Sequence, residues 1–320
     1  MILCTGESLI DMVTDGAGSY RPLSGGAVYN TTVALGRLGQ PTGYFWPISR
    51  DPFGEQLLRP LAEAGVNIDL CPRTDRLTTL AFVTLTGGEA RYAFYDEGSA
   101  GRMLRPEDVP ALPASVTALF AGGISLVPDP CGAAVESLIA REQDRLPVML
   151  DPNIRPFFIT DAGAFRARLN RLLPMADIVK LSGDDLEWLF PELAPDDAAQ
   201  QVLTMGPRIV LQTGGAKGAR AIWAGDTVSA PAIRVQVADT IGAGDTVMGT
   251  IVAEIDARLH DVDRTADRTS HDAPSDASPA DVVRAWGPEQ CGPILERAVR
   301  AAAITVSRPG ANPPTAAELG

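Results

Sequence analysis

The sequence predicts an α/β protein in which a central, mostly parallel β-sheet lies between layers of helices. Strand-like and helix-like segments alternate along most of the 320 residues, and this alternation is typical of a parallel sheet covered on both faces. A hairpin-like segment at residues 78–98 departs from the alternation and predicts a small β appendage. A glycine-rich turn near residue 242 marks the start of a late helix.

The first segments begin the alternation. Residues 1–5 form a short apolar run that predicts a buried strand, and residues 30–39 predict a helix that ends at a glycine. Residues 41–49 are strand-like. A second helix is expected from Asp51, because aspartate is a preferred N-cap and proline follows at the first helical position.

The hairpin-like segment carries two strand-like runs that flank a glycine pair, which is typical of a tight hairpin turn. Such a hairpin does not fit a βα repeat. We therefore expect residues 76–100 and residues 12–24 to form a β lid, inserted in a single domain that spans residues 1–320.

The alternation returns after the hairpin. The expected strands cover residues 118–127, 147–151, 177–182 and 208–215. The expected helices between them cover residues 131–145, 163–176 and 196–205. Regular alternation of this kind again indicates parallel strands joined by helices.

Residues 235–255 predict a glycine-rich turn followed by a helix. Glycine inside a helix is about 1 kcal/mol less favourable than alanine, so Gly242 and Gly244 are assigned to the turn. The following helix has one apolar face, formed by Val247, Ile251, Ile255 and Leu259. Asp245 then lies in the first helical turn, where free N–H groups and the helix dipole favour an anion. Taken alone, these residues also allow Asp245 to be a helix cap.

The last part of the chain contains a polar segment and a helix. Residues 256–281 carry seven Asp, three Arg and almost no large apolar side chain, which predicts a surface loop within residues 256–290. A final helix is expected around residues 295–306, because proline and glycine in residues 308–314 prevent its continuation.

Composition excludes several classes of function. The 27 basic and 40 acidic residues give a net charge of −13 and a pI of about 4.6, which argues against nucleic acid or an anionic membrane as the main partner. The four cysteines are far apart, so free thiols are expected and neither a zinc site nor a disulfide framework is indicated. The N-terminal segment does not have the pattern of a leader, and a cytoplasmic protein is expected.

Six motifs occur in order along nearly the whole chain: SGGAVYN, DPNIRP, DIVKLS, QTGGAKGA, DTIGAGD and SRPGANPP. Together they resemble the ribokinase-like (PfkB) carbohydrate kinase family, and DPNIRP and RPGANPP look most like its fructokinases. The resemblance implies a three-layer α/β sandwich with a β lid, through which a homodimer could form. It also implies an ATP- and Mg²⁺-dependent sugar kinase that phosphorylates fructose, with 2-keto-3-deoxygluconate kinase and ribokinase as the alternatives.

The resemblance assigns the phosphoryl-transfer step to the DTIGAGD motif. Asp245 would be the general base that accepts a proton from the sugar hydroxyl. Backbone N–H groups of Gly242, Ala243 and Gly244 would stabilise charge on the γ-phosphoryl group as an anion hole. Because the hydroxyl loses its proton late, a carboxylate of ordinary pKa is sufficient.

The sugar side is assigned to residues of the first half of the chain: Asp11, Gly25, Gly26, Asn30, Arg91 and Arg155. By resemblance, Asp11 would bind vicinal hydroxyls and Asn30 would add an amide. The two glycines would let the backbone approach the sugar, or would form an ordinary turn before a helix. Arg91 and Arg155 are candidates to bind a hydroxyl, keto or carboxylate group, and either could instead lie on the surface.

The nucleotide side is assigned to two later motifs. Lys180 follows a buried strand, where an ammonium group needs an anion or a carboxylate partner, and the triphosphate is the natural candidate. Thr213, Gly215 and Gly218 match a nucleotide-contacting loop of similar enzymes, although a β-hairpin turn would have much the same sequence.

A divalent and a monovalent cation are also implied. The family often has Asn-x-x-Glu after the lysine strand, whereas this chain has Ser182 and Asp185, so Asp185 would reach Mg²⁺ through water.

By resemblance, a monovalent cation such as K⁺ would be held by Asp239 and by backbone carbonyl groups at Ile241 and near Thr305 and Gly310. The alternative is that Asp239 only caps the turn.

Three rival classes are less well supported. A dinucleotide-dependent oxidoreductase needs G-x-G-x-x-G after the first strand, and a P-loop kinase needs G-x-x-x-x-G-K-[ST]; the sequence has neither pattern. A catalytically silent sugar-binding protein on the same fold would be expected to lose the base or the anion hole. Asp245 and residues 242–244 are both present.

Overall fold

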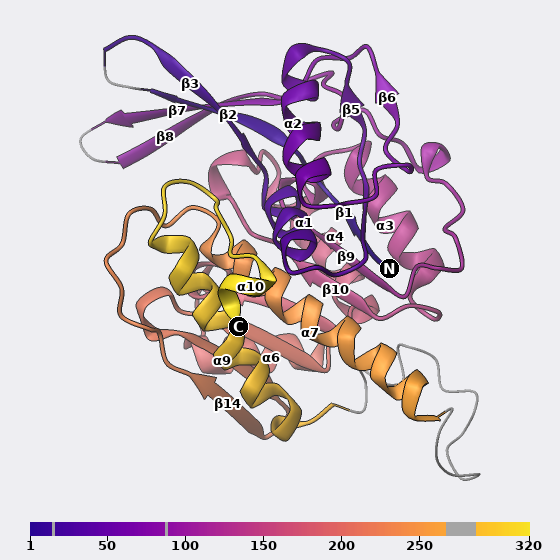
Figure 1. Ribbon diagram of the computed structural model, residues 1–320, viewed down its shortest axis with the longest axis vertical. Coiled ribbons are helices and arrows are strands. Elements are labelled where there is room, and N and C mark those ends of the chain that lie inside the picture. Colours follow the sequence, from indigo (N-terminus) through magenta and orange to yellow (C-terminus); the bar gives the residue numbers. More distant parts are fainter. Residues whose placement is uncertain (15–16, 87–88, 267–285) are drawn as a thin grey trace.

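The computed structural model describes residues 1–14, 17–86, 89–266 and 286–320 of the chain. An eight-stranded sheet runs through the centre in the order β14-β13-β12-β11-β10-β9-β1-β4 (Figure 1). Its strands are β1 (Ile2–Thr5), β4 (Thr42–Phe45), β9 (Ala118–Gly122), β10 (Val148–Asp151), β11 (Ile178–Ser182), β12 (Ile209–Thr213), β13 (Ala219–Trp223) and β14 (Asp226–Ala230). Pairing is parallel from β4 to β12, whereas β13 is antiparallel to both of its neighbours. The predicted α/β architecture is confirmed.

Helices cover this sheet. They are α1 (Ala27–Arg37), α2 (Pro52–Glu63), α3 (Cys131–Glu142), α4 (Ala162–Leu172), α5 (Gly183–Leu189), α6 (Pro195–Thr204), α7 (Ala243–Ala266), α9 (Pro288–Val306) and α10 (Ala316–Leu319). Helix α7 packs between α1 and α9, and α9 also packs on β13 and β14. Asp51 caps α2 as expected, because its side chain accepts a hydrogen bond from the Gly54 N–H at 2.7 Å and proline follows it.

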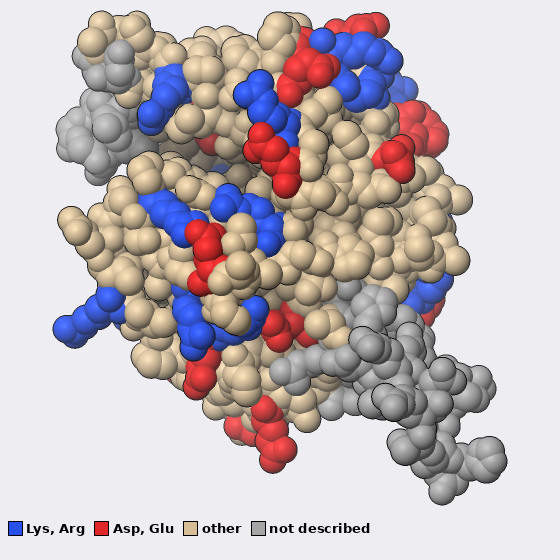
Figure 2. Space-filling model, viewed as in Figure 1, with Lys and Arg blue, Asp and Glu red and all other residues tan. Residues whose placement is uncertain are grey.

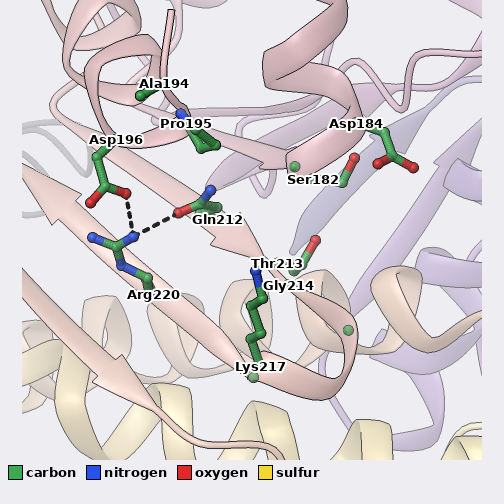
Figure 3. Close-up of a pocket in the computed structure, with 13 residues that line it drawn as sticks. Ser182, Asp184, Ala194, Pro195, Asp196, Gln212, Thr213, Gly214, Lys217 and Arg220 are labelled. Atoms are coloured by element: carbon green, nitrogen blue, oxygen red, sulfur yellow. Dashed lines mark hydrogen bonds and ion pairs between the residues drawn. The ribbon is translucent and has the colours of Figure 1, made fainter.

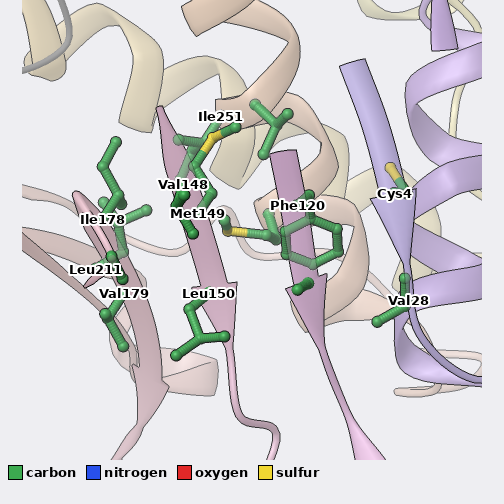
Figure 4. Packing of buried hydrophobic residues seen from close by; sticks show 14 of the residues in the cluster. Cys4, Val28, Phe120, Val148, Met149, Leu150, Ile178, Val179, Leu211 and Ile251 are labelled. Carbon is green, nitrogen blue, oxygen red and sulfur yellow. The ribbon is translucent and has the colours of Figure 1, made fainter. Parts of the chain in front are cut away.

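The hydrophobic core forms where the central strands meet the helices. Every residue of β1, β4, β9 and β10 is buried, as expected for strands covered on both faces. Ile251 of α7 packs with Phe120 and Met149 of the sheet in this core (Figure 4). The predicted apolar face of α7 is therefore confirmed at Ile251, and also at Val247 and Ile255.

A second sheet projects from one end of the body, and we call it the lid (Figure 1). Its four strands lie in the order β3-β2-β7-β8 and cover β2 (Leu9–Thr14), β3 (Tyr20–Gly25), β7 (Leu80–Thr86) and β8 (Glu89–Tyr95). The predicted hairpin and its association with the segment 12–24 are thus observed, while its glycine turn at 87–88 lies outside the described residues. Two short strands, β5 (Ile48–Ser49) and β6 (Arg73–Thr74), pair beside α2.

The expected loop at 256–290 is wrong at both of its ends. Helix α7 continues through 256–266, and α9 already begins at Pro288; residues 267–285 lie outside the described part of the chain. The acidic composition was misleading because residues 256–273 contain neither glycine nor proline to end the helix. The sequence also gave no warning of the short helix α5.

One expectation from composition can be checked directly. All four cysteines are free thiols, as expected. Within the described ranges, the structure has no helix that is both long and apolar enough to cross a bilayer.

Candidate active site

A cavity of about 670 Å³ lies at the carboxyl ends of the central strands, beneath the lid. Figure 2 shows the hollow between the lid and the body. In open parallel sheets, ligands bind at this edge, because loops from several strands meet there. The lid contributes Asp11 and Phe94 to the cavity wall, the strand ends contribute Arg155 and Lys180, and the start of α7 contributes Asp245.

Asp245 lies in the first turn of α7 at the bottom of this cavity and is 8% exposed. Its Oδ2 accepts a hydrogen bond from the Asn30 amide at 2.9 Å, which fixes the carboxylate relative to α1. Burial raises its pKa from 3.8 to about 6. The carboxylate is therefore more basic than the ordinary group that the sequence implied, yet it is mainly ionised at neutral pH.

The turn before Asp245 has the shape required to approach an anion. Gly242 has a φ of +77°, and a Cβ there would lie 2.7 Å from the Cβ of Ala311, so only glycine fits without strain. Ala243 begins α7, and Gly244 is its second residue. Gly242 and Gly244 line the cavity, where their backbone can meet an anion. Ala243 does not line it, and its N–H donates to the Thr240 carbonyl at 3.4 Å, so the predicted anion hole is not supported at Ala243.

Asp239 holds this turn in place. Its Oδ1 accepts from the Ile241 N–H at 3.0 Å, and its Oδ2 accepts from the Gly310 N–H at 2.9 Å. The carboxylate therefore joins the turn to the loop after α9, which supports the capping alternative without testing the cation. Thr305 is buried, and its hydroxyl group forms a hydrogen bond with the hydroxyl group of Thr246 at 2.9 Å.

Lys180 is buried, and its ammonium group donates to the Asp151 carboxylate at 2.7 Å. The predicted need for an anionic partner is thus met by a carboxylate inside the protein, and the triphosphate role of Lys180 stays a prediction. Burial acts to lower the pKa of Lys180, but the carboxylates of Asp151 and Asp185 raise it above its ordinary value. The ammonium lies only 3.5 Å from where a Cβ of Gly244 would be, so this fixed positive charge adjoins the turn.

Asp185 completes the capping box at the start of α5, whose N-cap residue is Ser182. Its Oδ2 accepts from the Ser182 N–H and hydroxyl at 2.7 Å each, and its Oδ1 accepts from the Ile154 N–H at 2.8 Å. A direct metal bond would disrupt these contacts. Oδ1 retains one lone pair for a metal-bound water, so the residue fits only the indirect role that the sequence suggested.

The residues predicted for the sugar converge on the lid side of the cavity. Burial raises the pKa of Asp11 to about 6, and Asp245 adds to this shift. Gly25 lies against Asp11, because a Cβ there would be 2.2 Å from Oδ2. Arg155 lines the cavity and is exposed, and its guanidinium donates to the Ile154 carbonyl at 3.1 Å. Arg91 pairs with Thr84 in the backbone ladder of the lid, and its side chain is outside what the structure describes.

An aromatic contact between lid and body was not predicted. Tyr92 of β8 stacks on Phe157, which follows Arg155, with centroids 4.7 Å apart and planes at 3°. Phe94 meets Phe158 edge to face at 4.8 Å. Aromatic residues after DPNIR were the only sequence signal for this contact.

A second cavity of about 710 Å³ is lined by Ser182, Asp184 and Thr213 (Figure 3). These three residues also line the first cavity, so the two cavities adjoin. Gly215 and Gly218 also line the second cavity, from the turn that joins β12 to β13. These two strands are antiparallel neighbours. The hairpin interpretation of QTGGAKGA is therefore correct, and the same turn borders a cavity.

No group of three or more His, Cys, Asp or Glu side chains in the described residues is arranged to hold a metal ion.

Comparison with known proteins identifies the family. Residues 1–318 match the model of the pfkB family carbohydrate kinases. A fructokinase of Rhizobium leguminosarum bv. trifolii is 46% identical over 259 residues, which are 80% of this chain and 79% of that protein. A fructokinase of Klebsiella pneumoniae is 30% identical over 259 residues, 79% of this chain and 83% of that protein.

The fold comparison agrees. The crystal structure of a fructokinase from Xylella fastidiosa with bound ATP superposes with a TM-score of 0.84 at 28% identity, covering 99% of this chain and 96% of that one. The order of motifs, the strand-end cavity and these similarities lead to one conclusion. The chain belongs to the pfkB family of carbohydrate kinases and is a sugar phosphotransferase.

Proposed function

We propose that the protein is an ATP-dependent fructokinase that converts D-fructose to fructose 6-phosphate. The observation that carries this proposal is the buried Asp245 carboxylate, held by Asn30 beside a glycine turn at the bottom of a sugar-sized cavity. The 46% identity to a fructokinase supports the choice of sugar.

In the proposed reaction, Asp245 accepts the proton of the attacking fructose hydroxyl. That oxygen forms a bond to the γ-phosphorus while the bond from the γ-phosphorus to the bridging oxygen of ADP breaks. Backbone N–H groups of Gly242 and Gly244, which line the cavity, stabilise the charge that moves onto the phosphoryl oxygens. The Lys180 ammonium adds a fixed positive field, although it is already paired with Asp151.

Magnesium would neutralise charge on the phosphate chain. Asp185 could orient a metal-bound water through its remaining lone pair, and the exposed Asp184 carboxylate stands at the junction of the two cavities. These oxygen donors suit Mg²⁺, which retains several waters when bound to proteins. ATP use and free thiols both favour a cytoplasmic enzyme.

The charges of the cavity favour a neutral sugar over an acidic one. Among the side chains that the structure describes, five carboxyl groups line it, from Glu7, Asp11, Asp184, Asp185 and Asp245, and the cationic groups are Arg155 and the already paired Lys180. Burial raises the pKa of Glu7 to about 7 and that of Asp11 to about 6, so Glu7 carries only part of a negative charge at neutral pH. A sugar acid such as 2-keto-3-deoxygluconate would bring a further negative charge into this field. Fructose would bring hydroxyl groups that can donate to the carboxylates.

A sugar panel tests the proposal. ADP release is measured with fructose, 2-keto-3-deoxygluconate, ribose and nucleosides, and without sugar. We expect the highest kcat/KM with fructose and little ADP release without sugar. Preference for the sugar acid would contradict the electrostatic argument, and sugar binding without ADP release would indicate a silent binding protein.

We also propose that two copies associate through the lid. The exposed rings of Tyr20 and Tyr95 pack against the Phe82 ring in T-shaped contacts, with centroids 5.0 and 5.3 Å apart, and these aromatic residues lie on the projecting sheet. Tyr95→Ser should convert a dimer to a monomer in light scattering. Leu193→Ser, which removes an exposed apolar side chain from the body, is the control and should leave the mass unchanged. A monomeric wild type would refute the proposal.

A further inference from the structure

Glu7 is a buried carboxylate that the proposed chemistry does not use. It follows β1, is 6% exposed and lines the cavity. Buried glutamates are rare unless the surrounding structure satisfies their charge. The groups that satisfy Glu7 therefore indicate what it does.

The carboxylate of Glu7 joins two segments that border the cavity. Its Oε1 accepts from the Ala27 N–H at 2.9 Å, and its Oε2 accepts from the Ser125 N–H at 3.2 Å. Ala27 is the first residue of α1, whose N-cap residue is a glycine without a capping side chain and whose first turn carries no acidic residue. Glu7 thus supplies from a distance an acceptor oxygen that this helix start lacks, and because burial raises its pKa to about 7, the carboxyl group is only partly ionised at neutral pH.

The backbone around Glu7 leaves room only for this carboxylate. Gly123 has a φ of +71°, and a Cβ there would lie 2.2 Å from each carboxylate oxygen of Glu7. Gly26 has a φ of +113°, and a Cβ there would lie 2.5 Å from the Glu7 carbonyl oxygen. Both glycines are needed because a side chain would displace the glutamate.

Helix α1 connects this contact to the proposed base. Asn30 lies one turn after Ala27 and donates to Asp245, and the Thr31 hydroxyl donates to the Asp245 carbonyl at 3.3 Å. We infer that Glu7 is a positioning residue for phosphoryl transfer: it fixes the start of α1, and α1 places the Asp245 carboxylate against the sugar hydroxyl. This inference deepens the proposed kinase function and rests on it.

The test uses Glu7→Gln in the full-length enzyme. The glutamine oxygen can still accept one N–H, but its amide group is a donor facing the second N–H, so one of the two contacts is lost. Displacement of a reacting group by a fraction of an ångström lowers the rate more than binding, so kcat should fall about tenfold while KM for fructose and ATP changes less than twofold. The rate is expressed per nucleotide site titrated by calorimetry, which excludes unfolded protein.

Glu142→Gln is the matched control. Glu142 is also 6% exposed, but it binds Arg141 of α3 and Arg145, which follows that helix, and it does not line the cavity. Its kcat per site should equal that of the wild type. An unchanged kcat in Glu7→Gln, or an equal loss in both variants, would overturn the positioning role.

Glu7→Asp serves as a second variant, since its shorter side chain cannot reach both N–H groups and should also lower kcat. If both Glu7 variants fail to fold, Glu7 is a general structural requirement and the inference is wrong. Absence of sugar-dependent turnover in the wild type would instead refute the proposed function. In that case, amide hydrogen exchange tests whether Glu7 holds the start of α1. Faster exchange in Glu7→Gln, confined to the first turn of α1 and to Ser125, would support this contact, and unchanged exchange would refute it.

Discussion

Asp245→Asn should inactivate the enzyme and stabilise it at the same time. The amide keeps the shape of the side chain and can still accept from Asn30 at the position of Oδ2, but it cannot accept the substrate proton. Loss of base catalysis should lower kcat by at least about 10²-fold while fructose and ATP still bind. A variant that retains more than a tenth of kcat would show that Asp245 is not the base.

The size of the stability change follows from the raised pKa. Burial moves the pKa of Asp245 from 3.8 to about 6, so above pH 6 the folded protein holds a charge that the unfolded chain holds more favourably. A shift of about two pKa units means that the Asp245 charge destabilises the folded protein by about 3 kcal/mol. This destabilisation is complete above the folded-state pKa and disappears below about pH 4, where Asp245 is protonated in both states. Asp245→Asn should therefore raise the free energy of unfolding by roughly this amount at pH 8.

Denaturant unfolding at pH 8 and pH 5 measures this change, and the gain should shrink at the lower pH. Asp51→Asn is a control of opposite sign. Burial acts to raise the pKa of Asp51, but hydrogen bonds from Thr78 and Gly54 bring it below the ordinary value, so this variant should be less stable at pH 8. Loss of stability in Asp245→Asn at pH 8 would refute the reasoning from burial.

Three further predictions concern pH, the lid and the cation. Because the proposed base has a raised pKa, kcat/KM should fall about tenfold per pH unit below about pH 6, as the base becomes protonated; a profile flat to pH 5 would contradict the assignment. Hydrogen exchange in β7 and β8 should slow when fructose binds, since closure of the lid excludes water, and unchanged exchange at saturating fructose would argue against closure. Wild-type kcat should be higher in K⁺ than in a bulky organic cation at equal ionic strength, with the difference lost in Asp239→Asn; equal wild-type rates would leave Asp239 as a structural clamp only.

The fold was predictable because its signals are local. Apolar runs of four or five residues marked the buried strands, and Asp51 followed by proline marked the start of α2. Residues 256–266 were predicted to be a loop but form the end of α7. The acidic composition suggested a loop, whereas the absence of glycine and proline, a local signal, indicated that the helix continues. Helix boundaries depend on such single residues, whereas the type of element depends on a longer pattern.

The candidate site was predictable only in part, because sequence motifs name residues but not their partners. Asp245 and Asn30 were both expected near the sugar, yet their hydrogen bond joins positions 215 residues apart. The contacts of Glu7 are to backbone N–H groups, which any residue type provides. No pattern of side chains could therefore have identified Glu7.

Lys180 shows where more could have been inferred. Its strand, β11, lies beside β10 in parallel, and the register pairs Leu150 with Val179. That register places the next residues, Asp151 and Lys180, side by side at the same edge of the sheet, where they form the 2.7 Å ion pair. Two charged residues at the ends of consecutive predicted strands thus predict a salt bridge as well as a phosphate site. Because the pair is buried at the edge where the reaction takes place, removal of either partner would leave an uncompensated charge beside the anion hole.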